Sequence, residues 1–137
     1  MRFPICFLLL AAGSWSGAVA AGDITVQVNN LRSEVGLIRV AICPEKSFTE
    51  PTCPWRGFAP AAMSVVTVTD VPDGIYAVQA FHDEDSDGEL NRRGFRPSEG
   101  LGFSNDARIR FGPPKFEDAA IQIQGNGVLT VNMRYYQ

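Results

Sequence analysis

The sequence predicts an all-β protein, an antiparallel β-sandwich of about seven strands. Three observations support this prediction. Several short segments alternate apolar and polar residues with a period of two, which is typical of half-buried strands. Clusters of glycine, proline, asparagine and aspartate separate these segments, and no segment keeps a sustained helical period.

Two strands are expected at the start of the domain. In "DITVQVNNL", Ile24, Val26 and Val28 alternate with polar residues, and "GLIRVAIC" repeats the pattern after a turn at residues 33–36. This arrangement predicts a hairpin. Residues 44–62 contain four prolines and one glycine, so this stretch is expected to be a loop.

Five further strands complete the prediction. "MSVVTVTDV" and "IYAVQAFHD" are separated by the turn signal "PDG". Residues 92–118 are rich in glycine, proline and charge, and we expect their phenylalanines to pack this segment down, with a short strand near residues 107–111. "AAIQIQG" and "GVLTVNMRYY" close the chain around a turn at residues 125–127. The alternation predicts one interior that contains Val26, Val28, Val40, Ile42, Val66, Val68, Tyr76, Val78, Ile121, Ile123, Leu129, Val131 and Met133.

The first 20 residues have the pattern of a secretory signal peptide. Met1 and Arg2 form a short basic start, residues 3–12 are apolar, and Ala18-Val19-Ala20 matches a small-x-small cleavage site. The alternative is a transmembrane anchor, but the apolar run is shorter than the roughly 20 residues that a bilayer requires. The mature chain, residues 21–137, is then a single exported domain in the periplasm or outside the cell, and it has no second stretch that could span a membrane.

Charge and cysteine content narrow the class of protein. The formal net charge is −3, which predicts no basic face for nucleic acid. The partner stays unknown at this point, and a protein or glycan of the cell envelope is one candidate. Cys43 and Cys53 form an even pair in an exported chain, which favours a disulfide. A free buried pair and metal thiolates are the alternatives, but two sulfurs with no second pair make a poor zinc site.

The segment "HDEDSDGELN", residues 82–91, matches most of a calcium loop of the D-x-D-x-D-G type. Alternating side chains of a tightly coiled loop converge on one point, and the glycine permits the turn. Three carboxylates held this close would repel each other without a cation. The expected ligands, at positions one, three, five, seven and nine, are Asp83, Asp85, Asp87, Glu89 and Asn91.

The match is incomplete at position twelve, where the bidentate glutamate of a helical calcium hand is replaced by Gly94. A strand rather than a helix leads into the loop, so the last ligand is expected from elsewhere, either Glu99 or Asp106. The alternative is a solvated acidic loop without an ion, because aspartate and asparagine also favour turns.

His82 is the only histidine of the chain. Beside carboxylates it could act as a general base, or it could bind a transition metal, but no second histidine or nearby cysteine completes such a site. At the end of a strand, we expect it to form a hydrogen bond to a neighbouring loop.

Three longer motifs, "GIYAVQAFHDEDSDGELN", "GLGFSNDA" and "FGPPKFEDAAI", resemble a bacterial secreted family, domain of unknown function 2141. The resemblance covers nearly all of the mature chain. It implies a small, immunoglobulin-like β-sandwich of the transthyretin or carboxypeptidase-regulatory type, with residues 82–118 as the characteristic surface. It brings no established activity.

These observations predict a non-enzymatic, exported module with a calcium-binding loop and a binding or structural role at the cell envelope. Two other functions remain open. One is a carbohydrate- or peptide-binding module that uses Trp55, Phe58, Tyr76 and the loop phenylalanines as a stacking surface. The other is a hydrolase centred on His82 and its neighbouring carboxylates.

Overall fold

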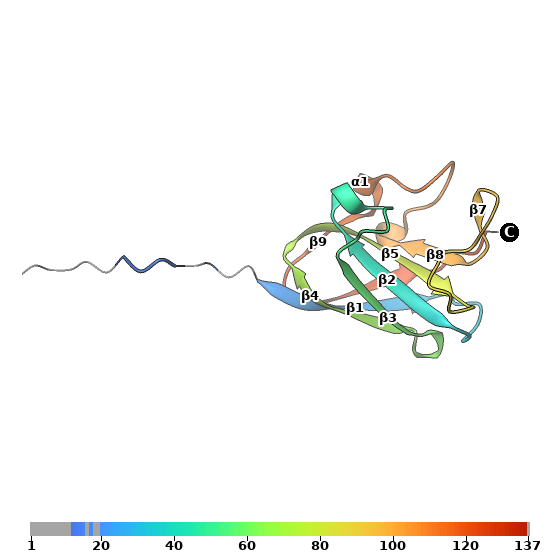
Figure 1. Ribbon diagram of the computed structural model, residues 1–137, viewed down its shortest axis with the longest axis horizontal. Coiled ribbons are helices and arrows are strands. Elements are labelled where there is room, and N and C mark those ends of the chain that lie inside the picture. Colours follow the sequence, from blue (N-terminus) through green and yellow to red (C-terminus); the bar gives the residue numbers. More distant parts are fainter. Residues whose placement is uncertain (1–11, 16, 18–19, 137) are drawn as a thin grey trace, which may run out of the picture.

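The computed structural model describes residues 12–15, 17 and 20–136, and its fold is all-β, as predicted. The predicted signal peptide, residues 1–20, lies mostly outside the described residues, and the first strand begins at Ala21. The strands are β1 (Ala21–Asn29), β2 (Leu37–Cys43), β3 (Trp55–Pro60), β4 (Val65–Pro72), β5 (Gly74–Asp83), β6 (Arg92–Arg93), β7 (Arg96–Pro97), β8 (Gly100–Phe103), β9 (Ala120–Ile123) and β10 (Gly127–Asn132). One helical turn, α1 (Phe116–Ala119), and the 3₁₀ turns Glu45–Ser47, Ala61–Met63 and Ser104–Asp106 lie between them (Figure 1).

Two sheets form the body of the domain (Figure 1). One has the order β10-β1-β4, and the other has the order β3-β2-β5-β8, with β9 paired to the first half of β5. The pairings are antiparallel, except that β1 and β10 run parallel. Strands β6 and β7 form a separate small hairpin. Within the described residues, no helix is long and apolar enough to cross a bilayer.

The inner faces of the two sheets share one hydrophobic core. Val26 and Val131 from the first sheet and Ile42 and Val78 from the second are completely buried. Of the thirteen predicted interior residues, eleven are buried, and Ile121 and Leu129 are partly buried against the same core. The period-two pattern therefore identified the inward side chains correctly.

The predicted hairpin of the first two strands is wrong. β1 pairs with β10 and β4, whereas β2 pairs with β3 and β5, so β1 and β2 lie in different sheets. The last two strands are also separated, because β9 pairs with β5 and β10 pairs with β1. Alternation shows which face of a strand is buried, but it carries no information about its neighbour.

The predicted loop at residues 44–62 contains a strand, β3, and the strand expected near residues 107–111 does not form. Strand β3 contains a glycine, Gly57, where it passes close to β4 of the other sheet. A Cβ at this position would lie 2.7 Å from the carbonyl oxygen of Thr67 in β4, so only glycine allows the two sheets to approach this closely. The strand that the segment after β5 does form beside it is β8, which pairs antiparallel with the second half of β5.

The predicted disulfide joins Cys43 and Cys53, whose Cα atoms are 5.0 Å apart. It belongs to a second, smaller core on the outer face of the sheet that contains β2 and β5. There Phe48 makes edge contacts with Phe103 and Phe116, at centroid distances of 6.0 and 5.9 Å. Two of the loop phenylalanines thus pack inward as expected, whereas Phe95 and Phe111 are fully exposed.

Candidate metal centre

Asp83 is the last residue of β5, and its side chain is completely buried. Its Oδ2 accepts hydrogen bonds from Nε of Arg39 at 2.6 Å and from the backbone N–H of Gly88 at 3.0 Å. Its Oδ1 accepts the backbone N–H of Asp87 at 3.1 Å. The carboxylate therefore holds the loop that follows it in a closed turn.

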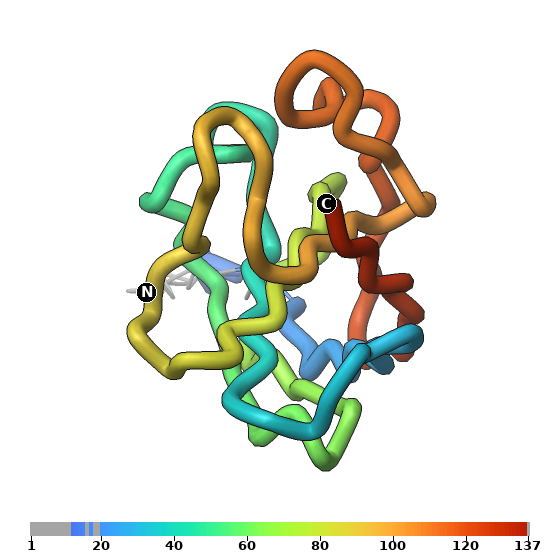
Figure 2. The backbone as a smooth tube through the Cα atoms, turned by 90° about the vertical axis from the view of Figure 1, so that its right-hand side faces the viewer, coloured from blue at the N-terminus to red at the C-terminus, as the bar shows by residue number. Residues whose placement is uncertain are grey.

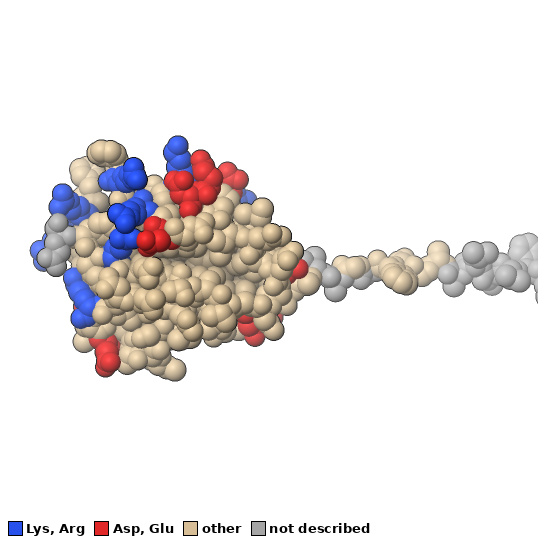
Figure 3. All heavy atoms as spheres, turned by 180° about the vertical axis from the view of Figure 1, so that it is seen from behind, with Lys and Arg blue, Asp and Glu red and all other residues tan. Residues whose placement is uncertain are grey.

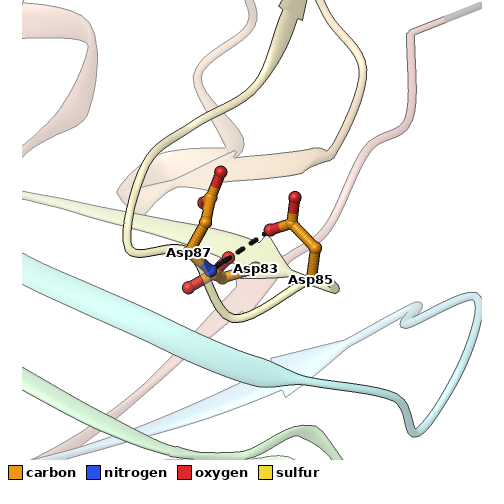
Figure 4. A group of neighbouring side chains, drawn as sticks. All are labelled: Asp83, Asp85 and Asp87. Carbon is orange, nitrogen blue, oxygen red and sulfur yellow. Dashed lines mark hydrogen bonds between the residues drawn. The ribbon is translucent and has the colours of Figure 1, made fainter.

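The loop brings three carboxylates together, as the sequence pattern predicts (Figure 4). One oxygen from each of Asp83, Asp85 and Asp87 lies within 4.8 Å of the others. Gly88 has a φ of +82°, a conformation that glycine adopts without steric cost. The N–H of Asp87 also reaches Oδ1 of Asp85 at 3.3 Å, and the N–H of Glu89 reaches Oδ1 of Asp87 at 2.9 Å.

Glu99 contacts the loop through hydrogen bonds to its backbone, rather than as a member of the carboxylate group. Its Oε1 accepts the N–H of Glu84 at 3.1 Å and its Oε2 accepts the N–H of Asn91 at 3.2 Å, so one buried carboxylate ties the two ends of the loop together. Burial, together with the charges of Asp85 and Asp83, raises the pKa of Glu99 against the effect of these two hydrogen bonds. Glu99 therefore adds a carboxylate beside the group of three without belonging to it.

The other expected ligands occupy different positions. The amide of Asn91 donates to Oδ2 of Asp85 at 2.7 Å, and Glu89 is exposed. Asp106 forms an ion pair with Arg134 in the 3₁₀ turn after β8. The structure thus brings Asp85, Asn91 and Glu99 to one loop and pairs Asp106 with a different cation.

Two arginines supply positive charge to the loop. Burial alone would raise the pKa of Asp83, but the hydrogen bonds from Arg39 and Gly88 and the charge of Arg39 outweigh it, so the net shift is downward. Arg32 acts in the same way on Glu84, whose pKa is lowered against the effect of burial. Sequence inspection missed Arg39, because 44 residues separate it from Asp83 and no local pattern joins them.

His82 lies beside the loop but faces the core. Its Nε2 is 2.7 Å from the carbonyl oxygen of Val35, which can only accept, so this nitrogen carries the proton. Its Nδ1 then accepts from the hydroxyl of Tyr135 at 2.8 Å, and that hydroxyl accepts the N–H of Arg32 at 3.0 Å. The expected hydrogen bond to a neighbouring loop is present, and both ring nitrogens of this completely buried histidine are engaged.

The aromatic residues considered as a stacking surface do not lie together on the outside. Tyr76 is buried, and Trp55 packs edge-on against it with a centroid distance of 5.3 Å. Phe58 is exposed, and the guanidinium of Arg39 lies over its ring at 5.5 Å.

Comparisons with other proteins identify the family. No curated protein and no solved structure matches the chain. A family model described as an uncharacterized protein conserved in bacteria, DUF2141, matches residues 26–132. The matched range begins in β1 and ends at the last residue of β10, and it includes the whole acidic loop. The chain therefore belongs to this bacterial family, domain of unknown function 2141.

Proposed function

We propose that the protein is an exported, non-enzymatic β-sandwich module of the transthyretin or carboxypeptidase-regulatory type, whose loop at residues 83–91 binds calcium. Its role would be binding or structural support at the cell envelope, with an envelope protein or glycan as partner. The single observation that carries the calcium proposal is the convergence of oxygens from Asp83, Asp85 and Asp87 within 4.8 Å.

The chemistry of the loop suits a hard cation. Calcium takes six to eight oxygen ligands, and here Asp83, Asp85 and Asp87 each supply a carboxylate oxygen. Backbone N–H groups already orient all three aspartates, so little ordering would remain to be done on binding. Zinc prefers nitrogen and sulfur ligands, and the buried nitrogens of His82 are engaged elsewhere.

Arg39 is the main obstacle to calcium at this position. Its guanidinium bonds Oδ2 of Asp83, where the first ligand of the loop would be. Each carboxylate oxygen has two lone pairs, and Oδ1 of Asp83 uses one of them for the N–H of Asp87. That oxygen could therefore still bind an ion, while Arg39 would weaken the affinity by electrostatic repulsion.

The export part of the proposal rests on the N-terminal sequence pattern and the disulfide. A bond between Cys43 and Cys53 is stable in an oxidising compartment. The two alternative functions have less support: His82 is buried with both nitrogens bonded, and Trp55 and Tyr76 pack against each other in the core.

The proposal is tested by calorimetric titration of the exported protein with calcium, magnesium and zinc after chelation, together with thermal unfolding in each ion. We expect calcium to bind and to raise the midpoint of unfolding, with zinc unable to replace it. Calcium at 100 times its dissociation constant should add about 2.7 kcal/mol to the free energy of unfolding. If calcium produces neither heat nor a shift in the midpoint, the loop is a solvated turn neutralised by Arg39.

A further inference from the structure

The basic residues of this acidic chain are concentrated in two loops. Residues 92–97, "RRGFRP", and residues 108–115, "RIRFGPPK", hold six of its 12 lysines and arginines and no acidic residue, although the formal net charge of the chain is −3. Figure 3 shows basic side chains gathered at the end of the molecule opposite the start of β1.

Each of these loops presents one fully exposed phenylalanine. Phe95 lies in the two-residue turn between β6 and β7, beside Gly94 with a φ of +63°. Phe111 lies in the bend that runs from Arg110 to Pro113. A single exposed phenylalanine needs no explanation, but two such rings, each between an arginine and a glycine in the sequence, form a repeated arrangement.

The two loops lie at the same end of the molecule. Residues of both, including Arg92, Phe95, Arg110 and Phe111, line one groove over the outer face of β2, β3 and β5. Figure 2 shows the backbone of both loops on the same side of the molecule, in gold for residues 92–97 and in orange for residues 108–115. Because both rings are fully exposed, they project from the rims rather than pack against the groove walls.

We propose that the tips of these two loops dock the protein on the surface of a membrane that contains anionic lipids. The rings of Phe95 and Phe111 enter the boundary between headgroups and acyl chains, and the surrounding arginines bind lipid phosphates. This combination of apolar insertion and basic contacts is the general basis of peripheral membrane binding. A planar membrane surface can contact both tips at once, so two contacts that are weak alone give a higher overall affinity for the membrane.

The floor of the groove argues against an occupant held inside it. Arg39 is bonded to Asp83 and lies over the ring of Phe58, so the cation and the aromatic ring at the floor are already engaged with partners from the chain itself. The two fully exposed rings, Phe95 and Phe111, and most of the basic residues are at the rims, whereas the exposed ring of Phe58 on the floor is covered on one face by Arg39. Phe58 and Arg56, which line the floor but lie outside the two tips, therefore provide matched control positions.

The test is sedimentation of the exported protein with phosphatidylcholine vesicles that contain or lack phosphatidylglycerol. A chelator is present throughout, so that the result does not depend on the calcium proposal. We expect binding only to the anionic vesicles, weakened by salt. Phe95→Ser and Phe111→Ser should each weaken it by about tenfold, and Arg92→Gln and Arg110→Gln by about fivefold. Phe58→Ser and Arg56→Gln should leave it unchanged.

Several results would overturn the proposal. One is the absence of binding to the anionic vesicles. Another is an equal loss of binding in the Phe58 and Arg56 variants, which would place the contact in the groove. A third is competition by soluble alginate or polyglutamate that depends on these two floor residues, which would indicate an acidic polymer as the ligand. All variants are prepared with the same N-terminus, so differences in vesicle binding among them come from the substituted side chains. Far-ultraviolet circular dichroism checks that each variant is folded.

Discussion

Arg39, in the middle of β2, reaches across to Asp83 at the end of β5, with 2.6 Å between Nε and Oδ2. The strand register explains the contact, because Arg39 lies opposite Phe81, and Phe81 and Asp83 project from the same face of β5. The guanidinium therefore lies beside the first carboxylate of the acidic loop and supplies a positive charge that the loop sequence itself lacks.

The first prediction concerns stability and pH in Arg39→Gln. The pKa of Asp83 is lowered in the folded state, so its ionisation stabilises the fold above the unfolded pKa of about 3.9, and this contribution is lost as the pH falls through the folded pKa. The variant should lose about 2 kcal/mol at pH 7, as expected for a hydrogen bond between charged groups, and its stability should fall less on acidification. Urea unfolding between neutral and acidic pH measures both effects. Lys46→Gln removes the same charge from an exposed site and should behave like the wild type.

The second prediction concerns calcium binding by the loop. Asp87→Asn removes a charged ligand and should weaken calcium affinity by at least about tenfold, which is 1.4 kcal/mol. Glu89→Gln keeps the backbone carbonyl of the same loop and changes only an exposed side chain, so it should have a much smaller effect. Arg39→Gln should bind calcium more tightly than the wild type, because the competing cation is absent. Calorimetric titration measures all three, and equal affinities in the Asp87 and Glu89 variants would contradict the proposed ligand set.

The third prediction compares two neighbouring tyrosines. Tyr135→Phe removes a hydroxyl that donates to Nδ1 of buried His82 and accepts from Arg32, so it should cost about 1–3 kcal/mol. Tyr136→Phe removes a buried hydroxyl that has no hydrogen-bond partner among the described residues, so it should be neutral or stabilising. Urea unfolding at neutral pH measures the difference. A similar loss in both variants would argue against the hydrogen-bonded network around His82.

The fourth prediction concerns the disulfide. Mass spectrometry of the unreduced exported protein should find two fewer protons than in the reduced form, and Cys43 and Cys53 should resist alkylation until a reductant is added. Reduction should lower the free energy of unfolding by about 2–3 kcal/mol, because the bond closes a short loop. The double variant Cys43→Ala/Cys53→Ala should not respond to the reductant. Two thiols that react freely in the unreduced exported protein would contradict this assignment.

The fifth prediction concerns the core between the two sheets and compares buried and exposed valines. Val131→Ala in β10 and Val78→Ala in β5 remove completely buried methyl groups and should each cost about 1–3 kcal/mol. Val128→Ala, also in β10 but exposed, should cost less than about 0.5 kcal/mol. Thermal or urea unfolding measures the three values. An equal effect at Val128 and Val131 would mean that the register of β10 is different.

The local sequence pattern predicted the buried faces of the strands and the shape of the acidic loop correctly. Alternation placed Val26, Val78 and Val131 in the interior because the side chains of a strand point to opposite faces in turn. The spacing of Asp83, Asp85 and Asp87 brought their carboxylates together for a similar reason: the whole turn is built by residues within six positions of one another. Each of these features depends on a few consecutive residues, so the amino-acid order was sufficient to predict it.

Strand pairing and the environment of the loop depended on the fold as a whole. β1 lies between β10 and β4 rather than beside β2, and β3 passes close to β4 because Gly57 has no side chain. The packing of the strands also brings Arg39 to Asp83 and lets Glu99 accept hydrogen bonds from both ends of the acidic loop. These contacts join residues far apart in sequence, and their energy is gained only when both sheets pack on one core, so no local pattern encodes them.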